Sequence, residues 1–277
     1  MLIRVGYEIV FESPVPVPMI LMLYTHPSRA STLKHQEQIK LAPDIPIEEF
    51  TDTFGNRCGR IVAPPGHLRL CNDIIVEDSG QPDPVYSNVG QYSVPDLPAE
   101  TLQYLLGSRY CEVDRLSDIA WNLFGDTPPG WARVQAVCDW VYSNIRYGYE
   151  YARSTKTAYE TYTEKAGVCR DFTHIAVTFC RCLNIPTRYA SGYLGDIGVV
   201  GLPTPMDFHA WFEVFLDGQW YTFDARHNVP RVGRVLMARG RDAVDVALTT
   251  SFGPNKLVEF KVWANEVSQP ELSTAAT

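Results

Sequence analysis

The spacing of apolar residues changes character along the chain, from a period of two to a helical period. Odd-numbered positions from Ile3 to Phe11 are apolar, which predicts a β-strand with one buried face. Apolar runs over residues 19–24 and 68–76 predict further strands. Prolines and glycines gather over residues 82–98, so we expect a β-rich N-terminal domain to end there, at about residue 95.

Helical spacing follows this boundary and predicts a second domain over residues 96–277. Apolar residues recur at i, i+3, i+4 and i+7 in successive segments, which is typical of amphipathic helices. The segments cover residues 99–106, 116–125, 134–144, 157–165 and 169–184. Gly167 is the expected C-terminal cap of the helix over 157–165.

Cys169 is predicted to open the last of these helices, which Asn184 and Pro186 end. Unpaired N–H groups and the positive end of the helix dipole favour a thiolate at such a position. Asp171 would oppose the thiolate unless a cap or a partner occupies its carboxylate. Gly167 is expected to leave room for a substrate backbone near the sulfur.

Two aromatic and β-branched runs flank Asp217-Gly218, a strong signal for a β-hairpin. A two-residue turn pairs Leu216 with Gln219, so the numbers of paired residues sum to 435. His209 and Asp224 then lie on one face as diagonal neighbours, within reach of a side-chain contact. The chain thus carries a helix-terminal cysteine, a histidine and an aspartate placed to orient that histidine, which are the parts of a cysteine nucleophile site.

These segments resemble the core of the transglutaminase-like superfamily, which includes bacterial transglutaminase-like cysteine proteases. The resemblance rests on three blocks in the same order, over roughly residues 115–265. They are Gly167-Val168-Cys169-Arg170-Asp171-Phe172, then the segment from Leu183 to Tyr193, then His209-Ala210-Trp211-Phe212-Glu213-Val214 with Phe223-Asp224. A weaker match is Asp52-Thr53-Phe54-Gly55-Asn56, similar to the β-rich domain that precedes this core in many bacterial members.

The resemblance implies an α+β, papain-like transglutaminase core, with a helix-borne cysteine packed on an antiparallel sheet and a β-rich domain before it. It implies Cys169 as nucleophile, His209 as base and Asp224 as orienting acid. The expected activity is thiol-dependent cleavage of an amide bond, either a peptide bond or a glutamine side chain, in a peptide or protein substrate. The reaction is expected to pass through a thioester acyl-enzyme and to end in hydrolysis. Protein-glutamine amine transfer and a non-catalytic peptide-binding module are the alternatives. Many relatives follow the aspartate with Pro-Thr, whereas this chain has Ala225-Arg226-His227-Asn228.

Composition narrows the class of protein further. The 277 residues carry 24 Lys and Arg against 32 Asp and Glu, a net charge of −8, so nucleic acid is not an expected partner. The most apolar stretch is too short to span a bilayer, so no membrane is expected either. Seven cysteines, an odd number, without a signal-like start favour a reducing cytoplasm, and the resemblance implies a bacterial one. No H-E-x-x-H or paired C-x-x-C occurs, and we expect no metal or other cofactor.

Other chemically able residues have simpler interpretations. Cys58, Cys71, Cys111, Cys138, Cys180 and Cys182 are interpreted as small apolar residues. His174 lies about 140° round the helix from Cys169 and is interpreted as structural. His227 stays open as a substrate-binding residue, and Tyr147, Tyr149, Tyr159 and Tyr162 stay open as an oxyanion donor beside the N–H of Cys169. Five arginines at 226, 231, 234, 239 and 241 are interpreted as solvated surface, with attraction of an acidic substrate as the alternative.

Overall fold

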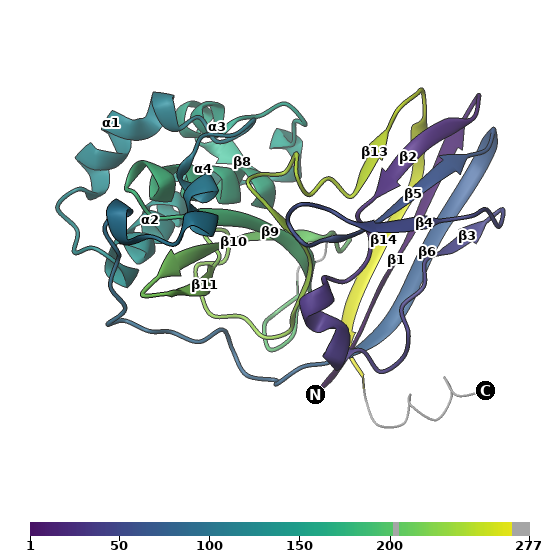
Figure 1. Ribbon diagram of the computed structural model, residues 1–277, viewed down its shortest axis with the longest axis horizontal. Helices are drawn as coiled ribbons and strands as arrows, with labels where there is room; N and C mark the ends of the chain where they lie inside the picture. The colour runs from purple at the N-terminus through teal and green to yellow at the C-terminus, as the bar shows by residue number, and fades with distance from the viewer. Residues whose placement is uncertain (202–204, 268–277) are drawn as a thin grey trace.

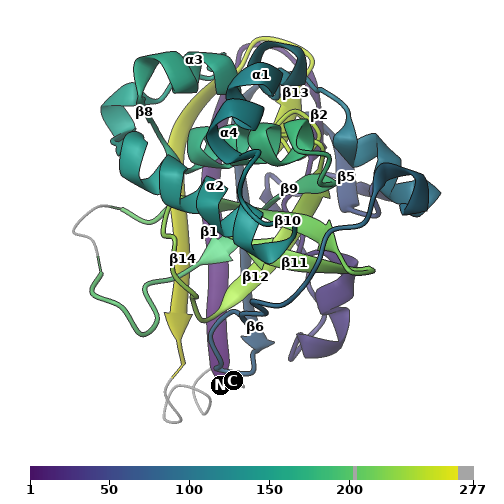
Figure 2. The ribbon, with the colours of Figure 1, turned by 90° about the vertical axis from the view of Figure 1, so that its left-hand side faces the viewer.

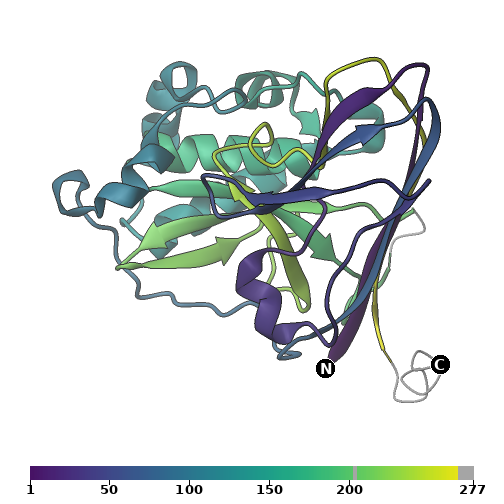
Figure 3. The same cartoon turned by 45° about the vertical axis from the view of Figure 1, so that its right-hand side comes forward.

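The computed structural model, which describes residues 1–201 and 205–267, combines helices with antiparallel sheets, as the sequence predicts. Two sheets face each other at one end of the molecule, and a third sheet covered by helices forms the other end (Figure 1). Figure 3 shows the two facing sheets edge on beside the helical end.

The two facing sheets form a β-sandwich around an apolar core. The first sheet has the order β14 (Lys256–Glu266), β1 (Leu2–Ser13), β6 (Gly66–Glu77) and β3 (Lys40–Ala42). The second has the order β13 (Thr249–Ser251), β2 (Val17–Leu21), β5 (Arg57–Ala63) and β4 (Glu48–Thr51). The odd-numbered residues from Ile3 to Phe11 are all buried, so the alternation predicted for the first strand is confirmed.

The sandwich includes the end of the described chain, which differs from the expected division at residue 96. Strand β14 pairs antiparallel with β1, and β13 pairs with β2. Two strands that follow residue 96, β13 and β14, thus complete the sheets of the N-terminal strands. This pairing joins residues more than two hundred positions apart, and no local turn signal indicates such a partner.

Residues 78–93, without helix or strand, run along one side of the molecule to the helical end (Figure 1). The α-helices are α1 (Val113–Phe124), α2 (Trp131–Asn144), α3 (Ala158–Glu164) and α4 (Cys169–Cys182). Short 3-10 helices are η1 (Pro27–Thr32), η2 (Val94–Asp96), η3 (Ala99–Leu105) and η4 (Tyr149–Tyr151). Within residues 1–201 and 205–267, none of the helices has the length and apolar character needed to cross a bilayer.

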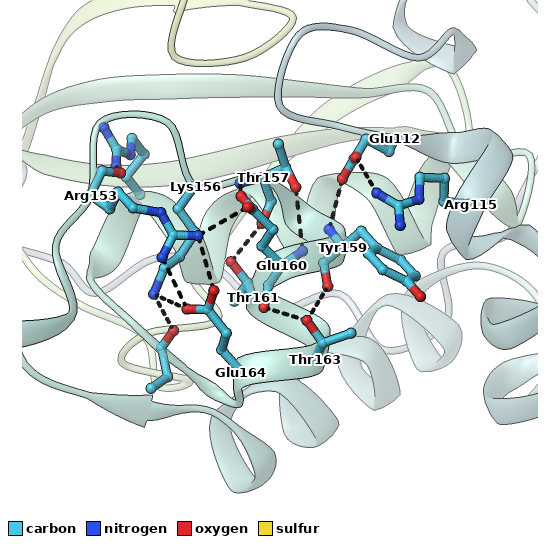
Figure 4. Close-up of polar contacts among 12 residues, drawn as sticks. Glu112, Arg115, Arg153, Lys156, Thr157, Tyr159, Glu160, Thr161, Thr163 and Glu164 are labelled. Atoms are coloured by element: carbon cyan, nitrogen blue, oxygen red, sulfur yellow. Dashed lines mark hydrogen bonds and ion pairs between the residues drawn. The ribbon is translucent and has the colours of Figure 1, made fainter.

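Helix α3 ends earlier than the sequence suggests. Thr157 and Glu160 form a capping box at its start (Figure 4). At its end Lys165 adopts a left-handed conformation, with φ of 53°. Lys165 is therefore the C-terminal cap, and the expectation of a Gly167 cap is wrong.

The third sheet supports the cysteine-bearing helix. Its order is β11 (Gln219–Phe223), β10 (His209–Leu216), β9 (Thr187–Leu194) and β12 (Arg234–Gly240), all antiparallel. Helix α4 packs against β10 and β9, and one apolar core joins it to α1, α2 and β10. Figure 2 shows the helices gathered on one side of this sheet. A short parallel pair, β7 (Arg146–Tyr147) and β8 (Ala166–Gly167), leads into α4.

Candidate active site

Cys169 is the first residue of α4 and is the expected helix-terminal cysteine. The N–H of Val168 donates to the Asp171 carboxylate at 3.0 Å, and Arg170 Nε lies 3.5 Å from that carboxylate. Asp171 is fully buried, and burial raises its pKa against these partners. The carboxylate that could oppose a thiolate at Cys169 is thus occupied by capping.

The need for glycine at position 167 has a different cause from the one expected. A Cβ at this position would lie 2.6 Å from the Cβ of Asp171. The missing side chain therefore makes room for the capping aspartate rather than for a substrate backbone.

The hairpin that carries His209 forms in the predicted register. Leu216 pairs with Gln219 and Glu213 with Thr222, around a turn in which Asp217 and Gly218 have φ of 42° and 81°. Positive φ at both positions is what an Asp-Gly hairpin turn requires. The ladder ends at Phe212–Phe223, one pair before the expected pairing with Asp224.

Asp224 leaves the strand and joins His209 to a buried arginine. Its Oδ2 lies 2.7 Å from His209 Nε2 and accepts from Arg234 Nη2 at 2.9 Å. Arg234 Nε in turn donates to Asp83, in the segment after β6, at 2.8 Å. Burial opposes the charge on Asp224, but His209 and Arg234 hold the pKa of this carboxyl well below its usual range.

His209 hydrogen-bonds to Asp224 and also to the Cys169 side chain. Burial alone would lower its pKa, but the Asp224 charge and the hydrogen bonds to Asp224 and Cys169 outweigh it and raise the pKa to about 9. The structure therefore brings the three predicted residues together: the thiol, the imidazole and the carboxylate. Cys169 and His209 border a hollow of about 520 Å³.

The other six cysteines have different surroundings. All seven are free thiols. Burial raises the pKa of the Cys58 and Cys111 thiols to about 11 and of the Cys180 and Cys182 thiols to about 12. Burial also raises the pKa of Cys138 and of the half-buried Cys71. These shifts favour the unreactive thiol form at all six positions.

Among residues 1–201 and 205–267, His174 has no carboxylate partner of the kind His209 has. Its ring is fully buried, stacks on Tyr110 with centroids 4.9 Å apart and accepts the Ala243 N–H at 3.2 Å. Burial, with Arg170 and Arg181 nearby, holds its pKa well below its ordinary value. Its surroundings are those of a neutral structural residue.

His227 lies beside His209 at the edge of the site. Its ring centroid is 4.9 Å from that of His209, and its Nδ1 lies 3.0 Å from Arg231 Nη1. Burial lowers its pKa to about 3. His209, Asp224 and His227 offer ligand atoms within 4.8 Å of one another, but the guanidinium groups of Arg231 and Arg234 already occupy His227 and Asp224. Their positive charge opposes a divalent cation, and we assign no metal to this group.

The structure separates the four candidate tyrosines. Tyr149 borders the hollow beside Cys169, and its hydroxyl is paired with that of Tyr147. Tyr159 and Tyr162 pack instead on the helical core, against Arg115 and Trp140. Glu213 is buried between Arg188 and Arg239 and does not border the hollow.

The sequence did not indicate Arg234 as a partner of Asp224, nor Asp83 as the partner of Arg234. Asp83 is 151 positions from Arg234 and lies in the segment between the two predicted domains. No motif or periodicity marks such a contact. No sequence signal marks Asp207 either, an exposed carboxylate that borders the hollow two residues before His209.

Comparison with known proteins places the chain in a family. A model of the transglutaminase-like superfamily matches residues 118–225, which include all three residues of the cluster. A crystal structure of a "putative cysteine protease" from Cytophaga hutchinsonii is 31% identical, with a TM-score of 0.83, and the match covers 97% of this chain and 91% of that one. The chain belongs to the transglutaminase-like superfamily.

A second relative matches over a shorter segment. It is an uncharacterized protein of Mycobacterium leprae (strain TN), 37% identical over 84 residues. The match covers 29% of this chain and 30% of that protein, so the chain spans less than a third of this curated relative. The expected α+β fold with a transglutaminase-like core is confirmed by the Cytophaga structure, and the superfamily supports a thiol-dependent function in general terms.

Proposed function

We propose that this protein cleaves amide bonds of a peptide or protein substrate, with Cys169 as nucleophile, His209 as acid and base and Asp224 as the group that orients His209. The observation that carries the proposal is the double partnership of His209, which joins the helix-terminal thiol to a buried carboxylate beside a hollow. The name of the Cytophaga relative, a "putative cysteine protease", supports the same chemistry.

The chemistry follows from the charges. The raised pKa of His209 favours an imidazolium at neutral pH. An imidazolium next to a cysteine stabilises the thiolate, which is the nucleophilic form. The thiolate attacks the amide carbon and a C–S bond forms. The C–N bond then breaks as His209 gives its proton to the departing amine. Water, deprotonated by His209, attacks the thioester carbon. The C–S bond then breaks, which releases the acid and leaves the Cys169 thiolate beside the protonated His209. The free N–H groups at the start of α4 would face the developing oxyanion, with that of Cys169 as our candidate donor.

Protein-glutamine amine transfer needs the same residues and differs only in that an amine replaces water. Hydrolysis and amine transfer can be distinguished by incubating the protein with a peptide library and a labelled primary amine and identifying the products by mass spectrometry. We expect cleaved peptides, and a fall in rate of about a thousandfold or more for Cys169→Ala. Incorporation of the label without cleavage would replace hydrolysis by transfer.

Cys71→Ala is the matched control, because Cys71 is the other thiol that is not fully buried. It should leave the cleavage rate within about twofold. An alkylating reagent should also modify Cys169 faster than Cys71 near neutral pH. Equal alkylation rates, with no cleavage by the wild-type protein, would favour the non-catalytic peptide-binding module.

A further inference from the structure

Cys169 lies where two hollows meet, and the smaller one has a distinct chemical character. The two share Tyr149, Cys169, Asp207, Phe208 and His209 in their walls. The smaller hollow, of about 190 Å³, is also bordered by Arg226 and His227 from the loop after β11 and by Ala264 and Asn265 of β14. A substrate that crosses Cys169 would therefore contact both hollows.

Arg226 differs from the other four arginines of residues 225–241. Arg234 is bound to Asp83 and Asp224, Arg239 to Glu213, and Arg241 to Asp245. Arg231 donates to the Gly195 carbonyl at 2.9 Å and lies 3.9 Å from Asp196. Arg226 has no carboxylate partner among residues 1–201 and 205–267, and its guanidinium lies 3.7 Å from the centroid of the Tyr147 ring.

The basic residues of the larger hollow are engaged as well. Arg153 is paired with Glu160 and Glu164 at 3.1 and 2.9 Å (Figure 4). Arg170 donates to the Arg153 carbonyl and lies 3.5 Å from Asp171. Within the described part of the chain, Arg226 is thus the guanidinium beside Cys169 that keeps its charge uncompensated.

The loop that holds Arg226 is fixed to the candidate catalytic cluster. Asp224 Oδ1 accepts the N–H groups of Arg226 and His227, at 3.0 and 3.1 Å. The Asn228 N–H closes the turn on the Asp224 carbonyl at 2.8 Å. The family match ends at residue 225, just before this loop. Because the loop is fixed by these hydrogen bonds and Arg226 borders the smaller hollow, Arg226 is well placed to select the substrate of this particular protein.

We propose that Arg226 binds a carboxylate of the substrate in the smaller hollow, a preference that rests on the amide cleavage proposed above. A stacked guanidinium keeps its donors free for a carboxylate, which it binds through two parallel hydrogen bonds. Asp196 borders the same hollow but lies near Arg231, and Asp207 accepts the Phe208 N–H. Asp207 borders both hollows, so it repels an anion where they meet, and the carboxylate is expected toward Arg226.

A pair of alkylating reagents tests this without requiring peptide cleavage. Iodoacetyl-glycine and iodoacetyl-glycinamide share the reacting carbon and differ only in a terminal carboxylate or carboxamide. The Cys169 thiolate displaces iodide from either, forming a C–S bond as the C–I bond breaks. We expect the ratio of acid to amide rates, measured at Cys169 by mass spectrometry, to exceed that of N-acetylcysteine by about fivefold.

Arg226→Gln should remove most of this preference, and Arg226→Glu should bring the ratio below that of N-acetylcysteine. Arg146→Gln is the matched control, because Arg146 also stacks on a tyrosine, Tyr151, but borders neither hollow. It should change the ratio by less than about twofold. An unchanged ratio in Arg226→Gln would overturn the proposal, and so would an equal fall of both rates, which indicates a structural role.

Peptides distinguish the source of the carboxylate. Binding to the Cys169→Ala protein is compared for peptides with a free or amidated C-terminus, and with Glu or Gln within the sequence. A preference for the free terminus identifies a carboxyl-terminal substrate, and a preference for Glu an acidic side chain; in either case Arg226→Gln should abolish it. An intact reagent ratio in a protein that cleaves nothing would keep the Arg226 assignment while removing amide cleavage. Peptide cleavage together with a reagent ratio that does not depend on Arg226 would keep amide cleavage and remove the Arg226 assignment.

Discussion

Two histidines of the helical end of the molecule, His174 on α4 and His209 on β10, are both buried, but their pKa values are shifted in opposite directions. Burial keeps His174 neutral, because only arginines lie among the charged groups that act on it. His209 has its pKa raised to about 9, because the Asp224 charge and its hydrogen bonds outweigh the same cost of burial. Burial therefore does not decide the charge of an active-site histidine; the partner carboxylate does.

The comparison also explains why the nearer histidine in sequence is not the candidate base. His174 is five residues from Cys169 on one helix, yet its ring stacks on Tyr110 and makes a tilted contact with Tyr189. His209 is forty residues away and reaches the thiol through the packing of β10 on α4. The variants below test whether Asp224 accounts for the difference.

Removing the carboxylate should have the largest effect. Asp224→Ala leaves His209 buried without its counter-charge, so we expect kcat/KM for peptide cleavage to fall by about a thousandfold. Asp224→Asn should lose less, since its amide oxygen can still accept the His209 N–H. In the Asp224→Asn variant the alkaline limb of the pH profile should move from about 9 toward lower pH, because the largest cause that raises the His209 pKa is gone. An unmoved limb would contradict the assignment.

Arg234 should have an intermediate effect as a positioning residue. It holds Asp224 and offsets part of its charge, so Arg234→Gln should lower kcat/KM by about tenfold while raising the alkaline limb by about half a pH unit. Arg234→Lys keeps the charge and should retain the limb of the wild type. A fall in rate with no movement of the limb would indicate a loss of packing alone.

His174→Phe should have the smallest effect on catalysis. The phenyl ring can keep the stack between Tyr110 and Tyr189 but leaves the Ala243 N–H without its acceptor. We expect kcat/KM within about threefold of the wild type, and a loss of about 1–3 kcal/mol in the free energy of unfolding, measured in urea. A rate loss as large as that of His209→Asn would reverse the roles given to the two histidines.

Much of the site could be predicted because it depends on local signals. The position of α4 in the sequence follows from its apolar periodicity and from Pro186, which lies just after its end. The register that brings Asp224 near His209 follows from Asp217-Gly218, whose two positive φ angles fix the turn. In each case one or two neighbouring residues restrict the backbone strongly.

The remainder depends on contacts between distant residues. Asp83 reaches Arg234 across 151 positions, and β14 completes a sheet begun by β1, without any local pattern to indicate the partner. The five arginines of residues 225–241 also depend on contacts with distant residues. Their interpretation as solvated surface is wrong for the buried Arg231 and for Arg234, because the carboxylates and carbonyls that hold them come from other parts of the chain. The sequence marks Gly167 as a special position, but only the fold shows that the reason is the close approach of Asp171.

The two histidines should also change the pH dependence of stability in opposite directions, because one pKa is lowered and the other raised. His174 has a lowered pKa in the folded protein, so its contribution to stability is present above the unfolded pKa of about 6.5 and is lost as the pH falls below it. His209 has a raised pKa, so its contribution is present below about 6.5 and is lost as the pH rises through about 9.

The wild type should therefore lose about 2 kcal/mol more than His174→Phe between pH 7 and pH 5 in urea unfolding. His209→Asn should instead differ from the wild type on the alkaline side. His26 and His227, whose pKa values are also lowered, are common to the wild type and His174→Phe and cancel in the difference between these two proteins. Identical acid losses in the wild type and His174→Phe would show that His174 is protonated in the folded protein, and that arginines and burial do not keep it neutral.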